Sequence, residues 1–211
     1  MITVAFAGTK GGSGRTTLSF ALAVEAAREY GVLLADLDPQ QSMADLWRRR
    51  QDIDNPMLVE HVKTVANAVS KLQRSGYARD LFVVDTPGSN MTVIREAVSA
   101  ANVVVLPVQP SPIDLLAQQA VVDLVDDLGK ADRALFVLNR IDPRNDLGKE
   151  ARRWLEKHHS LPVFEVAQRI AYVRAAVGGV AAGEIDKVAR AEMSGLLKLV
   201  RELSHGKPKG A

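Results

Sequence analysis

A glycine-rich stretch near the start of the chain contains the residue types that bind phosphate. It follows a short apolar run, residues 2–7, and has the sequence Lys10-Gly11-Gly12-Ser13-Gly14-Arg15-Thr16-Thr17. Glycines let a loop turn its backbone N–H groups around phosphate oxygens, and a following helix adds the positive end of its dipole. The Thr16 hydroxyl has the position that binds Mg²⁺ in such loops, and Thr17 can donate to an inner phosphate. We therefore expect this loop to bind a phosphate group together with a metal ion.

Aspartate residues lie at or just after the ends of two further apolar runs. At these positions their carboxylates can lie close to the glycine-rich loop. Asp36 and Asp38 come after the second run, and alternation along the chain places both on the same side. Both can face the metal and phosphate site, although Asp38 has the alternative task of capping the helix predicted from Ser42. Asp85 ends the third run, the arrangement in which an aspartate holds a Mg²⁺-bound water beside the Thr16 hydroxyl.

The elements that must position these residues alternate along the chain. The β-rich runs are residues 2–7, 32–35, 81–84, 103–107 and 134–138, and the helical segments are residues 16–30, 42–50, 91–100, 114–128 and 146–159. Continuous apolar runs suit strands that are buried on both faces of a parallel sheet. The alternation predicts an α/β fold, a doubly wound, mostly parallel sheet flanked by helices. We expect Gly31 and Gly129 to end two of the helices in the left-handed conformation.

The composition is that of one globular domain without disulfide bonds. The 211 residues are 47% hydrophobic and include no cysteine, which excludes thiolate zinc sites and Cys-ligated iron–sulfur clusters and fits a reducing compartment. No run reaches the ~18–20 apolar residues of a membrane span, so we expect a cytoplasmic protein. Because the net charge is only +2, any nucleic-acid binding must come from a local basic patch. We expect residues 1–203 to form one domain and residues 204–211 to form a flexible tail.

The phosphate-binding loop departs from the usual pattern G-x-x-x-x-G-K-[ST] at Thr9 and Arg15. Because two glycines follow Lys10, the loop resembles the K-G-G-x-G-K-[ST]-[ST] loop of the ParA/MinD superfamily of ATPases. The resemblance implies ATP or ADP with Mg²⁺ as ligands, and an ATP-dependent homodimer in which Lys10 reaches the phosphates bound by the other subunit. Arg15 still departs from the family pattern. Its guanidinium keeps the charge of the usual lysine but is planar and wider, so we expect weak hydrolysis.

The resemblance also implies roles for the residues of the site. By position, Asp36 resembles the residue near Mg²⁺ and Asp38 the residue that orients the attacking water, which implies catalytic roles for Asp38, Lys10 and Arg15 and metal contacts from Thr16, Asp36 and Asp85. The implied nucleotide-binding residues are Lys10, Gly11, Gly12, Ser13, Gly14, Arg15, Thr16, Thr17, Pro110, Asp114, Asn139, Arg140 and Arg169.

A proline-rich segment narrows the resemblance. Pro107-Val108-Gln109-Pro110-Ser111-Pro112-Ile113-Asp114 is similar to the matching segment of short ParF-like ParA proteins, in which the prolines and Asp114 lie near the nucleotide and the dimer seam. Asp114 can equally lie at the start of a helix. Asn139-Arg140 has the position of adenine-contacting residues in relatives, and residues 163–166 resemble the last strand, whose loop brings Arg169 toward the base. The alternative places Arg169 or Tyr172 on a solvated helix face.

The resemblance predicts a ParA-type ATPase that binds DNA without sequence preference and positions plasmid or chromosomal DNA, or another large cargo, on the nucleoid. The DNA-binding candidates are Arg152, Arg153, Lys198 and Arg201. The expected partner is a ParB- or ParG-like adaptor protein. Alternatives are an ATP-binding switch without turnover, a positioning ATPase for a protein compartment, and a metabolic P-loop enzyme, for which no acceptor pocket is marked. An amphipathic membrane-binding helix at residues 195–203 is disfavoured because its apolar spacing suits packing on the sheet.

Overall fold

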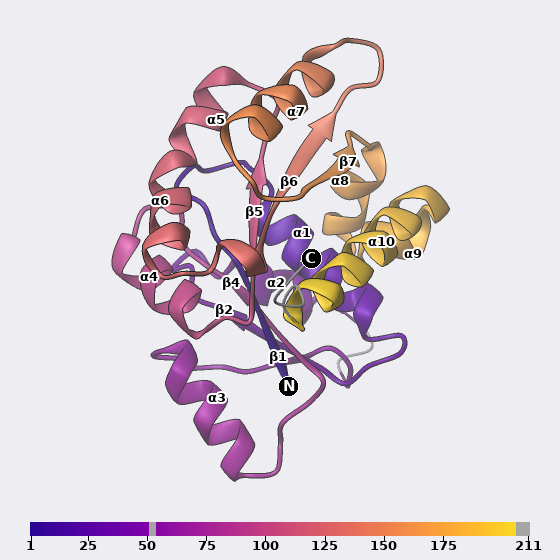
Figure 1. The fold of residues 1–211 in the computed structure, drawn as a ribbon. Helices are drawn as coiled ribbons and strands as arrows, with labels where there is room; N and C mark the ends of the chain where they lie inside the picture. Colours follow the sequence, from indigo (N-terminus) through magenta and orange to yellow (C-terminus); the bar gives the residue numbers. More distant parts are fainter. Residues whose placement is uncertain (51–53, 206–211) are drawn as a thin grey trace.

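Seven parallel strands form the centre of the computed structural model, which describes residues 1–50 and 54–205 (Figure 1). In spatial order they are β3 (Met57–Leu58), β2 (Val32–Asp36), β4 (Leu81–Asp85), β1 (Ile2–Phe6), β5 (Val103–Val108), β6 (Ala134–Ile141) and β7 (Val163–Ala167). The predicted α/β fold with a parallel sheet is confirmed. Because β1 lies between β4 and β5, the loops that follow these three strands meet at one edge of the sheet.

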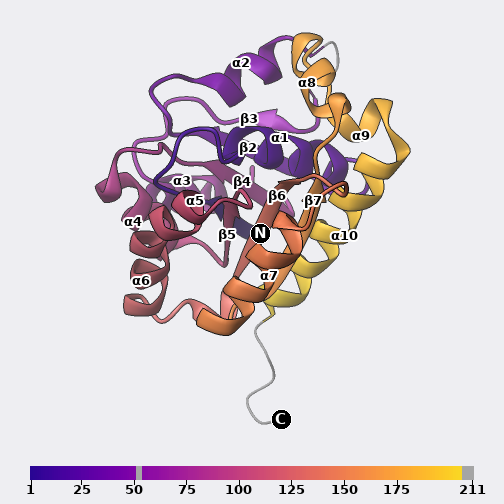
Figure 2. The same ribbon diagram turned by 90° about the horizontal axis from the view of Figure 1, so that it is seen from above.

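Helices cover both faces of the sheet (Figure 2). Successive side chains of a strand point to opposite faces, so each strand packs against both layers of helices. Val4 and Phe6 face one cluster of buried side chains, and Ala5 and Ala7 face the other. The first face is covered by α1 (Arg15–Ala26), α2 (Ser42–Arg48) and α10 (Lys187–Ser204). The second face is covered by α3 (Val65–Arg74), α4 (Met91–Ala100), α6 (Gln119–Asp127) and α7 (Leu147–His158). The strands are therefore buried on both faces, as their continuous apolar runs predict.

Several helix boundaries differ from the predicted segments. α1 ends at Ala26, and Gly31 has no positive φ, so the predicted left-handed cap there is wrong. Gly129 has a φ of 62° just after α6, which confirms the other cap. The predicted helix 114–128 is divided into α5 (Pro112–Ala117) and α6 at Gln118, whose buried side chain donates to the Ala7 carbonyl.

Some elements were not predicted from the sequence. They are β3, α3, a short 3-10 helix (Ala131–Arg133), α8 (Ile170–Val177) and α9 (Ala182–Ile185). Of the predicted tail, Ser204 ends α10, and the residues from 206 on lie outside the described part of the chain. Within residues 1–50 and 54–205, no helix is long and apolar enough to cross a membrane.

Candidate nucleotide-binding site

The glycine-rich loop connects the end of β1 to the start of α1 at the centre of the sheet. Gly12 and Gly14 have φ angles of 82° and 99°, a left-handed backbone that glycine adopts without strain. A Cβ atom on Gly14 would lie 2.1 Å from Nδ2 of Asn139, which donates to the Ser13 carbonyl at 2.9 Å. Asn139 of β6 thus stabilises the conformation of the loop by a side-chain hydrogen bond. Since its Oδ1 also accepts from the Arg140 N–H, the predicted contact of Asn139 with a base stays a prediction.

A candidate metal-binding corner lies where α1 meets the end of β4. The Thr16 hydroxyl donates to Oδ2 of Asp85 at 2.6 Å, while the other oxygen of this fully buried carboxylate has no hydrogen-bond partner. Burial raises the pKa of Asp85 to about 7, and the Asp36 and Asp38 carboxylates add to that rise against the opposing hydrogen bond from Thr16. An unpartnered carboxylate oxygen beside a hydroxyl fits a hard divalent cation such as Mg²⁺, which would favour the ionised form.

Asp36 and Asp38 have separate tasks. Oδ2 of Asp36 accepts from the backbone N–H groups of Met43 and Ala44 in the first turn of α2, and its Oδ1 accepts from the Asp38 N–H. Asp36 therefore caps α2, the task that the sequence offered to Asp38, and its contact with Mg²⁺ stays a prediction. Burial raises the pKa of Asp36 despite these three bonds. Oδ1 of Asp38 accepts from the Gln40 N–H at 2.9 Å.

Arg15 is buried beneath the loop. Its Nη1 donates to the Gly8 and Lys10 carbonyls at 3.0 and 2.7 Å, and its Nε donates to the Thr86 carbonyl at 3.1 Å. Nη2 occupies the space where a Cβ atom on Gly88 would lie, 2.7 Å away. The guanidinium thus ties the phosphate-binding loop to the segment that follows β4.

The loop after β5 is fixed to the phosphate-binding loop on the opposite side. Lys10 forms an ion pair with Asp114 at 2.7 Å, and the Thr9 hydroxyl donates to the Ala117 carbonyl. The Gln109 side chain donates to the Gly12 carbonyl at 2.8 Å. This contact was not predicted, although Gln109 lies in the proline-rich segment. Asp114 lies in the first turn of α5, so it both begins a helix and binds Lys10.

A cavity of about 720 Å³ opens beside the loop, between the ends of β6 and β7 and the first turns of α8. Asn139, Arg140 and Arg169 all line it, together with the exposed apolar side chains of Ile170 and Val173. Its volume is within the ~300–1,000 Å³ range of ligand pockets. The three predicted base-contacting residues are therefore brought together at one cavity.

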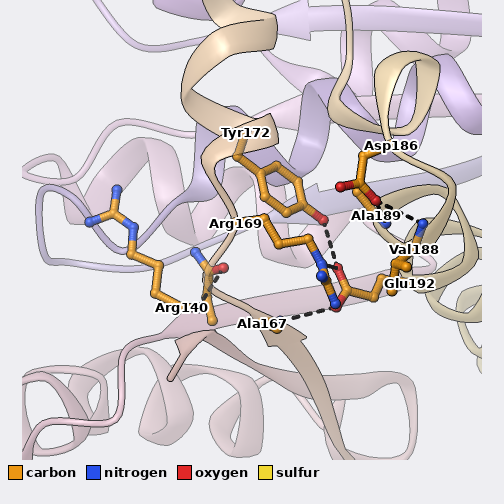
Figure 3. Close-up of polar contacts among 9 residues, drawn as sticks. Arg140, Ala167, Arg169, Tyr172, Asp186, Val188, Ala189 and Glu192 are labelled. Carbon is orange, nitrogen blue, oxygen red and sulfur yellow. Dashed lines mark hydrogen bonds and ion pairs between the residues drawn. The ribbon is translucent and has the colours of Figure 1, made fainter. Parts of the chain in front are cut away.

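Arg140 and Arg169 enter this cavity differently. Arg140 has a φ of 58° at an irregular step in the pairing of β6 with β7. Arg169 precedes α8 as its N-cap residue and is held by an ion pair with Glu192 of α10 at 2.9 Å (Figure 3). Only 26% of its side chain is exposed, so it does not lie on a fully solvated helix face. Glu192 was not predicted from the sequence, because a single carboxylate on a charged helix has no distinguishing local pattern.

The four candidate DNA-binding residues do not form one patch. Arg152 and Arg153 lie on α7 and Lys198 and Arg201 on α10, and these helices cover opposite faces of the sheet. The Arg152 guanidinium contacts the carboxylates of Glu156 and Glu165, which offset its charge. Arg201 lies over the Tyr30 ring, 4.5 Å from the ring centroid. DNA binding by these residues stays a prediction.

The sequence of the chain is similar to those of known proteins. Residues 4–180 match the CobQ/CobB/MinD/ParA nucleotide binding domain. The chain is 28% identical over 211 residues to the maintenance of carboxysome distribution protein A of Halothiobacillus neapolitanus, with 95% of each chain covered. It is 37% identical over 191 residues to the protein of that name from Gloeobacter kilaueensis, with 83% of this chain and 81% of the relative covered.

A solved structure shows the same fold at lower sequence identity. A plasmid partition protein from Borrelia burgdorferi, bound to AMPPNP, has a TM-score of 0.77 and 17% sequence identity, with 95% of this chain and 98% of that chain covered.

Proposed function

The chain belongs to the CobQ/CobB/MinD/ParA nucleotide-binding family, and from this premise we propose that it is an ATPase that dimerises on ATP and positions a large cargo. Membership confirms the resemblance that the Lys10-Gly11-Gly12 loop suggested. In the proposed cycle, the ATP-bound dimer binds DNA without sequence preference, and an adaptor protein on the cargo stimulates hydrolysis and release.

The observation that carries the proposal is the corner made by Thr16 and Asp85. A buried carboxylate with one unpartnered oxygen is costly unless a cation or donor completes it. Here it lies beside a hydroxyl at the first turn of α1, where a triphosphate bound by the loop would bring its metal. This pairing supports Mg²⁺-ATP as the ligand.

The side chains around this corner have distinct proposed tasks. Mg²⁺, when bound, supplies charge neutralisation for the phosphates. Asp38, whose Oδ2 accepts no bond from the described residues, is available to orient a water for attack. Lys10 is held on Asp114 within the subunit and is the residue proposed to reach the phosphates bound by the other subunit. Arg15 supplies positive charge from beneath the loop.

The identity of the cargo rests on the relatives. Two proteins whose name is maintenance of carboxysome distribution protein A match over most of their length, which favours a protein compartment as the cargo. The Borrelia burgdorferi plasmid partition protein shares only the fold with this chain, so plasmid or chromosomal DNA is the second candidate. Both proposals share the ATP-dependent dimer, the DNA surface and the adaptor protein on the cargo.

The catalytic part of the proposal is tested by replacing the metal-binding hydroxyl. Thr16→Ala removes the donor to Asp85 and the predicted Mg²⁺ ligand, and we expect ATP-dependent phosphate release, measured with DNA and adaptor present, to fall ~100-fold. Thr92→Ala on α4, an exposed threonine, is the matched control and should keep full activity. Phosphate release no faster than buffer in the unmodified protein would leave an ATP-binding switch without turnover.

The DNA-binding part is tested separately. ATP-loaded protein should retard duplex DNA of unrelated sequences at low salt, and binding should weaken steeply as salt rises, because phosphate contacts release counterions. Retardation without nucleotide, or none at low salt with ATP, would contradict this part of the proposal.

A further inference from the structure

One carboxylate outside the phosphate-binding loop organises the wall of the cavity. Glu192 lies on α10, on the first face of the sheet, and its side chain is largely buried. It accepts from the Ala167 N–H at the end of β7, from the Arg169 guanidinium at the start of α8, and from the Tyr172 hydroxyl (Figure 3). A single side chain thus joins a strand and two helices.

The bonding of this carboxylate is complete. An ionised carboxylate offers about four acceptor positions, and four donor groups of the chain occupy them: one backbone N–H, Nε and Nη2 of Arg169, and the Tyr172 hydroxyl. The neighbouring negative charge raises the pKa of Tyr172 further above its ordinary value, beyond the rise due to burial, so that Tyr172 stays a donor. The contacts that set Arg169 in place are therefore satisfied before any ligand binds.

Arg169 retains donors for a ligand. Nη1 has no hydrogen-bond partner in the described part of the chain, whereas Nε and Nη2 both point to Glu192. Arg169 lines the 720 Å³ cavity, and the ion pair with Glu192 cancels its net charge. The Nη1 donors of Arg169 are thus suited to a neutral hydrogen-bond acceptor, such as a purine ring nitrogen or a ribose oxygen.

Two helices carry the residues of this hydrogen-bonded group: α10 carries Glu192, and α8 carries Tyr172. Asp186 caps α10 by accepting from the N–H groups of Val188 and Ala189, which sets the helix on which Glu192 lies (Figure 3). Ile170 and Val173 of α8 expose apolar surface on the rim of the same cavity, surface that a planar base would cover. Arg140 extends away from Glu192 in Figure 3 and takes no part in the group.

We propose that Glu192 is a positioning residue for the base and ribose end of the nucleotide, holding Arg169 and the start of α8 in the geometry that ATP requires. The inference rests on the proposed function, because it assumes that the cavity receives the nucleoside of an ATP molecule whose phosphates lie in the loop. A preformed wall lowers the ordering cost of binding, so Glu192 contributes to affinity without touching the ligand.

The test compares two ligands that share phosphates but differ in the nucleoside. Full-length protein is titrated with a fluorescent ATP analogue and, by competition, with inorganic tripolyphosphate. In Glu192→Gln, an amide N–H group would face the donors of Arg169 and Tyr172, and we expect ATP affinity to fall about five- to tenfold. Tripolyphosphate affinity should change less than about twofold, because the phosphate-binding loop is untouched.

Control variants separate positioning from general damage. Glu202→Gln makes the same change at an exposed position of α10 and should bind both ligands as the unmodified protein does. Arg169→Gln should show the same selective loss, and the double variant should lose no more than either single variant, because both residues act through one contact. If Glu192→Gln fails to fold, Arg169→Lys keeps the ion pair but cannot span carboxylate and cavity, and should show the selective loss.

The outcomes distinguish the inference from the function on which it rests. Equal ATP affinity in Glu192→Gln and the unmodified protein, or an equal loss for ATP and tripolyphosphate, would overturn the positioning role while leaving ATP binding intact. Failure of the unmodified protein to bind the ATP analogue would overturn the proposed function and this inference with it.

Discussion

Arg15 is the residue at which this site departs most from an ordinary phosphate-binding loop. Its guanidinium donates to carbonyls on two sides, Gly8 and Lys10 in the loop and Thr86 after β4. A lysine ammonium has three donors on one nitrogen and cannot span those carbonyls in the same way. The charge is therefore held beneath the loop by three bonds, where it stabilises the loop but is less free to follow charge that develops on a transferred phosphate.

Replacing Arg15 by lysine should separate these two effects. In Arg15→Lys we expect the rate of phosphate release at saturating ATP to rise about tenfold, because a mobile ammonium can follow the developing charge. We expect the free energy of unfolding without nucleotide to fall by ~1–3 kcal/mol as buried carbonyls lose donors. Phosphate-release assays and urea denaturation measure the two quantities.

The control for this variant is Arg95→Lys on α4, where the side chain is exposed and only weakly paired. It should change neither quantity. Unchanged hydrolysis in Arg15→Lys would mean that the guanidinium serves the phosphates as well as an ammonium does.

At the scale of elements, the site depends on which residues lie at the carboxyl end of each strand. β1 leads into the phosphate-binding loop, β4 ends in Asp85, and β2 ends in Asp36. The short α2 would begin with free N–H groups, and Asp36 accepts two of them. Because Asp36 also accepts the Asp38 N–H, the cap of α2 fixes the backbone on which the proposed water-orienting carboxylate lies.

Removing this cap should destabilise the protein without any ligand present. For Asp36→Ala we expect the free energy of unfolding to fall by ~1–2 kcal/mol, the usual cost of losing a capping side chain. Urea denaturation in the absence of nucleotide and Mg²⁺ measures this term apart from any metal contact. Asp45→Ala, an exposed position of α2 paired with Arg48, is the control and should change stability by less than ~0.5 kcal/mol. Equal effects of the two variants would contradict the capping role.

At the scale of the whole molecule, the order of the strands decides which side chains meet. β2, β4, β1, β5 and β6 are consecutive neighbours in the sheet although they are not consecutive in the sequence. Their carboxyl ends and the loops that follow bring Asp85, Gln109 and Asn139 against the phosphate-binding loop or the first turn of α1. The same arrangement leaves Lys10 at the surface, 40% exposed and paired with Asp114, where it is accessible to the second subunit of the proposed dimer.

The proposed dimer gives a prediction at this scale. ATP-loaded protein should have the mass of a dimer in light scattering, and Lys10→Ala should weaken the dimer at least about tenfold, because a buried interfacial charge contact is lost. Binding of ATP to the monomer should persist, since the loop keeps its glycines. Lys149→Ala, which removes an exposed lysine paired with Asp146, should leave the dimer unchanged. A full-strength dimer in Lys10→Ala would refute the proposed role.

Much of the fold and part of the candidate site could be predicted from local sequence. The alternation of β-rich runs with helical segments predicts the parallel sheet, because burial on both faces requires continuous apolar strands. The glycine pattern predicts where a phosphate would bind, because the loop is one continuous segment of the chain. The carboxylate at the end of β4 predicts a metal ligand, but its contact with Thr16 joins residues 69 positions apart and needs the tertiary structure. Short elements such as β3 escaped prediction because tertiary contacts, and not propensity, stabilise them.

Only the tertiary structure decided the partners of the buried polar groups. Asn139 fastens Ser13 across 126 positions of the chain, Arg15 reaches Thr86 across 71, and Arg169 meets Glu192 across 23. A polar or charged group that loses water must find a partner, and the partner is whichever group the strand order brings within reach. The sequence by itself determined that a nucleotide loop exists, and the packing of strands and helices determined which side chains hold it and its cavity in shape.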